Sequence, residues 1–335
     1  MSQPANAPGQ DLPAEHSLFV PPLPIQRLRF TLRMAAPVRL PAWPGSALRG
    51  LLGHGLRRTV CVTGQRDCDA CLLKTRCLYT RFFDVHVGLA EACCGRGAVP
   101  HPWVLDVASP SPRMLAAGDR LAFHLVLIGE EAAEQLPYLV HALERAGHRG
   151  LGPSNAPFTL AMVEQETVLG LGGWRTLYEA GSNGMRTLTP VDVTPLPAAG
   201  FWRLHLVSPL RFKRRGRLVG PREFEPVHVW QLLRDRWTGL VACFGASADG
   251  VPADLLSSLP AEALSVVSLQ WRDWTRYSSR QRTRMQLGGL VGSLRVDSDV
   301  LDRAWPWLWL GQWLHLGKQT TMGLGQYRLL PEGAA

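Results

Sequence analysis

One short segment combines a histidine that could transfer a proton with two arginines that could stabilise negative charge. The segment PGSALRGLLGHGLRRT, residues 44–59, has leucines three and four positions apart, which predicts an amphipathic helix. At 100° per residue, His54 falls well outside the arc of leucines, with Arg57 beside it and Arg58 at the adjacent edge. A histidine can exchange a proton near neutral pH, and nearby positive charge lowers its pKa. The pattern is typical of a general acid or base, although an exposed histidine with no role also fits it.

The same predicted helix carries more glycine than a helix of ordinary stability. Gly50, Gly53 and Gly55 each lower helix stability by about 1 kcal/mol relative to alanine. The close approach of another backbone would compensate for this loss. We therefore expect the helix to pack tightly against a neighbouring element.

Four of the seven cysteines are spaced like metal ligands. Cys61, Cys68, Cys71 and Cys77 form C-x6-C-x2-C-x5-C within 17 residues, which suffices for a tetrahedral zinc site. Four protein ligands would close the site, so we expect structural zinc and no catalytic metal. Reduced thiols and other metal chemistry are the alternatives. An odd number of cysteines, behind a start without the pattern of a secretory signal, is not typical of a disulfide scaffold.

Positive charge is concentrated in the second half of the chain, which suits a polyanionic partner. The net charge is +9, and residues 1–200 contain 18 Lys and Arg against 16 Asp and Glu, whereas residues 201–335 contain 18 against 11. The run RFKRRGR, 211–217, predicts phosphate contact, with a solvated surface as the alternative. The run RDWTRYSSRQRTR, 272–284, interleaves arginines with aromatic residues, which is typical of stacking on unpaired bases.

The segment HLGKQTTMGLGQYRLL, 315–330, has too many glycines for a strand. It is not a nucleotide P-loop, because five residues rather than four separate Gly311 from Gly317, and Gln319 occupies the position of the hydroxyl. Glycine amides can nevertheless approach a phosphate closely. We expect a phosphate-binding loop that leads into the last strand.

The two halves of the chain repeat one order of elements. Each reads as β-α-β-β-α-β and ends in Gly-Leu-Gly before a strand, at 150–152 and 323–325. This order predicts an α+β fold of tandem ferredoxin-like (RRM-like) domains, with a C-terminal glycine-rich loop and a cysteine-rich insertion in the first domain. The expected parts are a disordered leader at 1–20, an N-terminal ferredoxin-like domain at 21–186 with the cysteine insertion at 61–77, a linker at 187–200, and a C-terminal ferredoxin-like domain at 201–335. We expect strands at 24–40, 81–85, 102–107, 121–129, 202–212, 264–274, 285–296 and 326–330, a loop leading into a strand at 148–164, and helices at 44–59, 130–147, 227–245 and 299–316.

Other patterns exclude some classes of protein. No run of about 18 apolar residues occurs, so we expect no membrane span and a cytoplasmic protein. The tryptophans at 305, 309 and 313 repeat every four residues, as on the buried face of a helix. No pair of carboxylates is placed for two-metal nuclease chemistry, so any cleavage of nucleic acid would proceed without metal.

Taken in order, several segments resemble one known family. PAWPGSALRGLLGHGLRRTVCVTG, the cysteine loop, WTRYSSRQRTRMQLGGLVGSL and LHLGKQTTMGLGQYRL resemble the CRISPR repeat-processing endoribonucleases, the sixth Cas family within the RAMP superfamily. The resemblance covers roughly residues 25–330, and the four-cysteine insertion looks like a feature of a subgroup. It implies two RRM-like folds that bind a repeat hairpin of precursor CRISPR RNA and cut it without metal, leaving a 2′,3′-cyclic phosphate and a 5′-hydroxyl. It also implies that the protein stays bound to the guide RNA (crRNA), with other Cas subunits as partners.

The resemblance also implies roles for particular residues. The family's catalytic histidine falls on His54, and Arg57 or Arg58 would stabilise charge on the phosphorane. A second catalytic residue cannot be placed. The residues expected to bind RNA are Arg49, Lys213, Arg214, Arg215, Arg217, Arg276, Tyr277, Arg280, Arg282, Lys318, Gln319, Thr320, Gly323 and Gly325. Two alternatives stay open: a RAMP subunit that holds crRNA without cleaving it, and a zinc-stabilised RNA-binding module with no CRISPR role.

Overall fold

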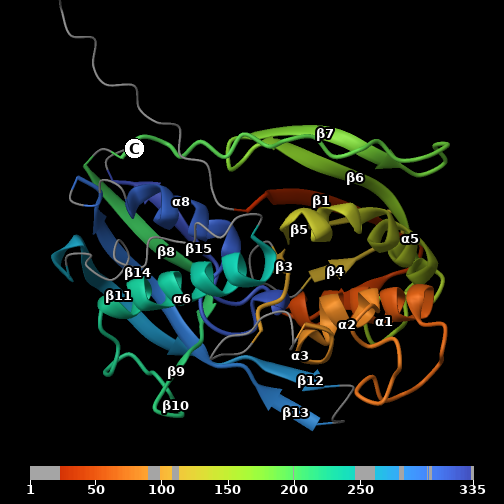
Figure 1. Cartoon of the computed structure of the whole chain (residues 1–335), viewed down its shortest axis with the longest axis horizontal. Helices are drawn as coiled ribbons and strands as arrows, with labels where there is room; N and C mark the ends of the chain where they lie inside the picture. The colour runs from red at the N-terminus through yellow and green to blue at the C-terminus, as the bar shows by residue number, and fades with distance from the viewer. Residues whose placement is uncertain are drawn as a thin grey trace, which may run out of the picture.

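The computed structural model of the chain describes residues 23–89, 99–107, 113–198, 200–245, 261–278, 283–299, 301 and 304–332. These residues form two main antiparallel sheets, each packed against helices (Figure 1). Within these ranges, no helix is both long enough and apolar enough to cross a membrane.

The first domain is built on a five-stranded sheet with the order β3-β5-β1-β6-β7. Its strands are β1 Ile25–Met34, β3 Trp103–Asp106, β5 Arg120–Ile128, β6 Phe158–Val168 and β7 Gly172–Glu179. Helices α1 (Gly45–Val60) and α5 (Leu136–Gly147) cover one face. Alternate residues of β1, namely Leu28, Phe30 and Leu32, are fully buried in the core that contains the leucines of both helices. The buried residues, which recur every second position on the strand and every three to four positions on the helices, therefore pack together in one core.

Shorter elements complete the first domain. They are β2 Val38–Leu40, which pairs with β4 Arg113–Leu115, and the helices α2 Leu78–Phe83, α3 Val85–Gly88 and α4 Glu130–Glu134. The cysteine loop, defined as residues 61–77, connects α1 to α2. The predicted strand at 24–40 is thus divided into β1 and β2.

The second domain has a four-stranded sheet with the order β11-β14-β8-β15. Its elements are β8 Phe201–Leu210, β11 Leu264–Arg272, β14 Gly289–Asp297, β15 Tyr327–Pro331, α6 Val227–Phe244 and α8 Trp305–Leu314, with the 3-10 turns η1 Ala261–Ala263 and η3 Thr320–Met322. Two hairpins extend from it, β9 Lys213–Arg214 with β10 Arg217–Leu218, and β12 Thr275–Ser278 with β13 Thr283–Gln286. The tryptophans of α8 are buried, as their spacing predicted.

Both sheets have the same topology. Along each sheet the strands of the repeat run second, third, first, fourth, which is β3-β5-β1-β6 in the first domain and β11-β14-β8-β15 in the second. Helices α1 and α6 follow the first strand, and α5 and α8 follow the third. The predicted α+β fold of tandem ferredoxin-like domains is confirmed. Strand β7, at the edge of the first sheet, was not predicted.

The prediction of a strand at 81–85 is wrong. Residues 78–83 form helix α2, in which Phe82 and Phe83 are 3% and 8% exposed. The carbonyl of Phe82 accepts a hydrogen bond of 2.8 Å from the indole of Trp103, which fixes the helix beneath β3. Periodicity alone does not distinguish a strand from a helix in so short an apolar run.

A buried ionic network around Asp106 joins the two domains. The Asp106 carboxylate, at the end of β3, accepts hydrogen bonds from Arg27 of β1 (3.0 Å), from Arg328 of β15 (2.9 Å) and from Gln326 just before β15 (2.6 Å). Burial alone would raise the pKa of Asp106, but the charges of Arg328 and Arg27 hold it well below its usual range. The carboxylate is therefore ionised and ties both sheets to one point.

Replacing Asp106 with asparagine should destabilise the protein by about 3–5 kcal/mol, the range for removing one member of a buried ion pair. The folded-state pKa of Asp106 lies below its unfolded value of about 4, so the carboxylate stabilises the fold above that pH. This contribution is lost as the pH falls below about 4, and the difference between wild type and variant should narrow there. Urea unfolding of both proteins between pH 7 and pH 3 measures the two effects.

The matched control is Glu332→Gln, which breaks the more exposed pairs that Glu332 makes with two arginines. Surface pairs contribute about 0–1 kcal/mol, so this variant should unfold nearly as the wild type does. If Asp106→Asn were no less stable than Glu332→Gln at pH 7, Asp106 would not hold the domains together.

Candidate active site

Helix α1 has three faces, each formed by residues four positions apart, and the first is the core face. Leu48, Leu52 and Leu56 are at most 1% exposed and pack in the core of the first domain. Gly55 lies near this face, where a Cβ atom would be 2.8 Å from the carbonyl oxygen of Ala142 on α5. The expected close approach of another backbone is confirmed at this glycine, and it fixes α1 on α5.

The second face, formed by Arg49, Gly53 and Arg57, is covered by other parts of the chain. The Nε of Arg49 donates to the hydroxyl of Thr321 (3.0 Å), and Gly53 lies against the ring of Phe83 on α2. Arg57 Nη2 donates to the carbonyl oxygens of residues 65 and 66 in the cysteine loop, at 2.5 and 2.9 Å. Arg57 is therefore directed at the cysteine loop, and its predicted role in catalysis finds no support in this geometry.

The third face, formed by Gly50, His54 and Arg58, is open. His54 and Arg58 are exposed, and a Cβ atom on Gly50 would have no neighbour within 4 Å. Burial lowers the pKa of His54, and the charges of Arg58 and Arg57 lower it further. At neutral pH His54 is therefore mostly neutral and able to accept a proton. The catalytic role of His54 stays a prediction, and this face has the chemistry for it.

Arg149 adds a second positive charge near this open face, and the sequence did not identify it. Burial lowers the pKa of Arg58, and the charge of Arg149 lowers it further. Arg149 is exposed just beyond α5, the helix that packs on α1. The available signal was its position directly after a helix predicted to lie in the same domain.

The glycine loop, residues 315–325, is packed inside the protein, and its expected phosphate-binding amides are not free. The amide of Gly323 donates to the carbonyl of Thr320 (2.9 Å), and that of Gly325 donates to Pro209 (3.0 Å). Thr320 is only 6% exposed. The expectation of free phosphate-binding amides in this loop is therefore wrong, whereas an RNA-binding role for Gly323, Gly325 and Thr320 stays a prediction. Lys318 is exposed, and its role in RNA binding stays a prediction.

The glycines of this loop are required by backbone conformation and by close packing. Gly323 and Gly325 have φ of 81° and 74°, in the left-handed region that favours glycine. A Cβ atom on Gly325 would lie 1.8 Å from the carbonyl oxygen of Leu316. Gln319 also has a positive φ (66°) and is half-buried. A glycine pattern of this kind resembles that of an anion-binding loop in sequence, but here the glycines allow a tightly packed turn inside the protein.

The basic residues of the β9–β10 hairpin are exposed, as phosphate contact requires. Lys213, Arg214, Arg215 and Arg217 are all exposed around a tight turn in which Arg215 and Gly216 have positive φ. Both this hairpin and β12–β13 lie at the lower side of the view in Figure 1. No described acidic group forms an ion pair with these four side chains within 4.0 Å.

The β12–β13 hairpin is anchored on the first domain. Trp274, just before β12, stacks on Trp43 with ring centroids 4.6 Å apart, and Leu287, just after β13, is buried in the first-domain core. The hairpin backbone includes Arg276 and Tyr277. Predicted contacts at Arg280 and Arg282 fall in residues 279–282, outside the described part of the chain.

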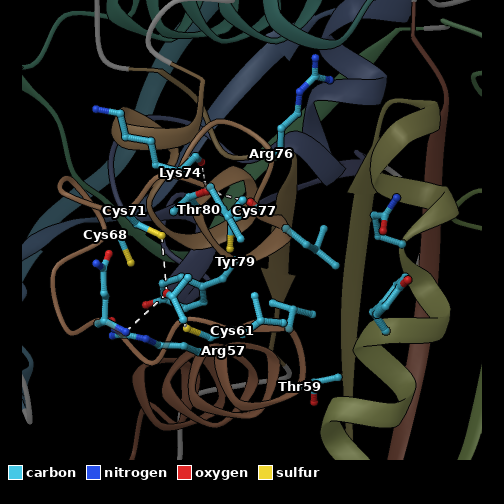
Figure 2. Close-up of a pocket in the computed structure, with 18 residues that line it drawn as sticks. Arg57, Thr59, Cys61, Cys68, Cys71, Lys74, Arg76, Cys77, Tyr79 and Thr80 are labelled. Atoms are coloured by element: carbon cyan, nitrogen blue, oxygen red, sulfur yellow. Dashed lines mark hydrogen bonds between the residues drawn. The ribbon is translucent and has the colours of Figure 1, made fainter.

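The four predicted metal ligands line one cavity of about 500 Å³ (Figure 2). Cys61, Cys68, Cys71 and Cys77 are free thiols. Among the described residues, no group of three or more His, Cys, Asp or Glu side chains is close enough to hold a metal ion as it stands. The zinc site stays a prediction. Cys243, for which the sequence offered no signal, is disulfide-bonded.

The structure therefore combines tandem ferredoxin-like domains with a basic second domain. Residues 204–327 match the family model of the CRISPR-associated endoribonuclease Cas6, and residues 23–191 match a family model described as an N-terminal domain, AF_1859_N. The second half of the chain therefore contains a domain of the Cas6 family. No curated protein sequence matches the chain.

Solved structures share the fold at low sequence identity. A partial Cas6-RT-Cas1–Cas2 complex matches 93% of this chain with 14% identity and a TM-score of 0.56, and this chain covers 47% of that one. A Cas6 product complex matches 91% of this chain and 99% of its own, with 17% identity and a TM-score of 0.50. The match to Thermus thermophilus Cas6 covers 92% of this chain and 99% of that protein's chain, with 14% identity and a TM-score of 0.50. The chain thus spans about half of the longer Cas6-containing chain and nearly all of the others.

The histidine on the open face of α1 should titrate below the ordinary histidine pKa of about 6.5. Arg58→Gln should raise the His54 pKa, because one of the positive charges that oppose its protonation is removed. Burial remains, so the pKa should stay below the ordinary value. NMR titration of the imidazole signals, with His54 assigned from the His54→Gln spectrum, measures both values.

Arg222→Gln is the control, since Arg222 is an exposed arginine of the second domain. It should leave the His54 titration unchanged. Equal His54 pKa values in wild type and Arg58→Gln would show that Arg58 does not act on the histidine.

Proposed function

We propose that this chain binds a repeat hairpin of precursor CRISPR RNA and cleaves it without a catalytic metal, giving a 2′,3′-cyclic phosphate and a 5′-hydroxyl. The observation that carries the proposal is the open face of α1, where an exposed, mostly neutral histidine lies beside positive charge. The match of residues 204–327 to the Cas6 family model and the fold shared with a Cas6 product complex support it.

In this mechanism the RNA supplies its own nucleophile. The 2′-oxygen attacks the adjacent phosphorus while His54 accepts its proton, and the bond to the 5′-oxygen breaks. The departing 5′-oxygen takes a proton from solvent. Negative charge grows on the phosphoryl oxygens, and Arg58 with Arg149 supplies the opposite charge at the same surface. Gly50 keeps the surface one turn before His54 free of side-chain bulk, which leaves room for a sugar-phosphate backbone.

RNA binding would draw on the exposed basic hairpin β9–β10. Its four positive side chains stand on a short hairpin anchored in the second domain, the half of the chain that carries most of the net positive charge. The hairpin β12–β13 contributes Arg276 and Tyr277 by sequence, and its base rests on the first domain beside α1. The likeness to a Cas6-RT-Cas1–Cas2 complex makes other Cas subunits candidate partners.

A second candidate function is a subunit that holds crRNA without cutting it. It is favoured by the second face of α1, where Arg57 binds the cysteine loop and Arg49 binds Thr321 instead of facing His54. The catalytic set is thereby reduced to His54, Arg58 and Arg149. Binding without cleavage would identify this function.

His54→Ala should lower the rate of hairpin cleavage by about 10²–10⁴, the usual contribution of a positioned general acid or base. The substrate is a synthetic repeat hairpin copied from the CRISPR array of the source organism, and the reaction contains EDTA. A 2′-deoxy sugar at the scissile nucleotide should abolish cleavage while binding persists. The products should carry a cyclic phosphate, identified by mass spectrometry.

The matched control is His141→Ala, which removes an exposed histidine from α5 of the same domain. It should cleave as the wild type does. Cleavage that survives His54→Ala would exclude His54 as the catalytic residue, and tight binding with no cleavage by the wild type would establish the crRNA-holding function.

Removing three charges from the β9–β10 hairpin, with Lys213, Arg215 and Arg217 all changed to glutamine, should weaken RNA binding. Each lost phosphate contact lowers the slope of log K against log salt by about 0.7–0.9, so the slope should fall by about 2. Fluorescence anisotropy between 50 and 300 mM salt measures it. Arg234→Gln, on α6 and paired with Asp235, is the control and should leave the slope unchanged. An unchanged slope in the triple variant would exclude the hairpin from the RNA interface.

A further inference from the structure

The cysteine loop has no core of its own. None of the 17 side chains from 61 to 77 is buried, and the loop contains no helix or strand. Two of its apolar side chains, Val62 and Leu72, are 82% and 96% exposed. Loops of this length without secondary structure are uncommon in compact domains, and small segments without a core are usually held by disulfides or a metal. All four cysteines of the loop are free thiols, so no disulfide holds it.

The four thiols nevertheless gather at one place. Cys61 follows the last turn of α1, Cys77 precedes α2, and Cys68 and Cys71 lie on one turn between them, where the Cys71 amide donates to the Cys68 carbonyl (3.2 Å). All four line the same cavity, and Figure 2 shows their sulfur atoms around it. The Sγ atoms of Cys61 and Cys71 lie 3.9 and 3.6 Å from one hydroxyl, that of Thr63.

The charges around the cavity complement a metal thiolate. Zinc bound by four thiolates carries a formal charge of −2, because binding of Zn²⁺ releases four protons from the thiols. Arg57, Lys74 and Arg76 line the same cavity and supply positive charge. The soft sulfur ligands select zinc over magnesium or calcium, which prefer oxygen.

We propose that Cys61, Cys68, Cys71 and Cys77 bind one zinc ion, and that binding draws the four thiols together and orders the cysteine loop around the last turn of α1. As they stand, the thiols do not form a metal-binding group among the described residues, so the site closes when zinc binds. Because Arg57 donates to two carbonyls of the loop, the ordered loop braces the end of α1, one turn beyond His54. The zinc has four protein ligands and takes no part in catalysis.

The zinc content of the purified full-length chain tests the site directly. Protein expressed with added zinc and purified without chelator should contain one zinc ion per chain, as measured by elemental mass spectrometry. Cys71→Ser and Cys77→Ser should each lose most of it. Leu72→Ser is the matched control. Leu72 directly follows Cys71 and its side chain is exposed, and this variant keeps all four thiols. It should keep one zinc per chain.

A second readout tests the brace on α1 and does not depend on cleavage. The Cys61 amide donates to the carbonyl of Arg57 (2.9 Å), so its hydrogen exchange should speed up when zinc is removed with a chelator and slow down when zinc is restored. Cys71→Ser should show the fast exchange at all times. No zinc in the wild type, or zinc that persists in both serine variants, would overturn the site. If hydrogen exchange of the Cys61 amide were equally fast with and without zinc, the proposed bracing of α1 by the loop would be wrong. Neither result bears on whether the chain cleaves RNA.

Discussion

The arrangement of the two domains depends on one buried carboxylate. Asp106 is 4% exposed and receives hydrogen bonds from Arg27 of the first sheet and from Arg328 and Gln326 of the second domain. A buried charge is tolerated only with close partners, so these side chains cannot separate without leaving an unpaired charge in the interior. Arg27 is held in turn by Glu166 of β6 (3.0 Å). The ends of β1, β3, β6 and β15 are thereby tied together.

This constraint explains the form of the glycine loop. Gln326 and Arg328 lie directly after the loop, so the network around Asp106 fixes the end of the loop against the first domain. The loop then meets the beginning of α1, where Trp43 donates to the carbonyl of Met322 (2.7 Å) and a Cβ atom on Gly45 would lie 2.0 Å from the same carbonyl oxygen. The glycine loop of the second domain therefore positions the helix of the first domain that carries His54. Its contribution to a site on α1 is mechanical rather than through its amides.

The sequence predicted the periodic features well and the contacts poorly. The core leucines of α1 and the repeated order of strands and helices follow from local periodicity, which a single sequence contains. The segment 81–85 was misjudged because its apolar run is too short to distinguish a helical period from a strand period. Strand β7 was missed because it begins with two glycines and is half-exposed. The role of the C-terminal glycines was misjudged for a different reason. Positive φ, close packing and anion binding all favour glycine, and only the tertiary structure separates them.

The same limit applies to the two arginines that follow His54. Arg57 and Arg58 are adjacent in sequence, but on a helix they are 100° apart, and four-residue spacing assigns them to different faces. Arg57 shares its face with Gly53 and turns to the cysteine loop, whereas Arg58 shares its face with His54 and stays open. Both charges lower the His54 pKa, but of the two arginines Arg57 is the one that also donates hydrogen bonds to the inserted loop. A change at one position can alter the charge at the open face without loosening the loop, and a change at the other can loosen the loop while Arg58 remains beside the histidine.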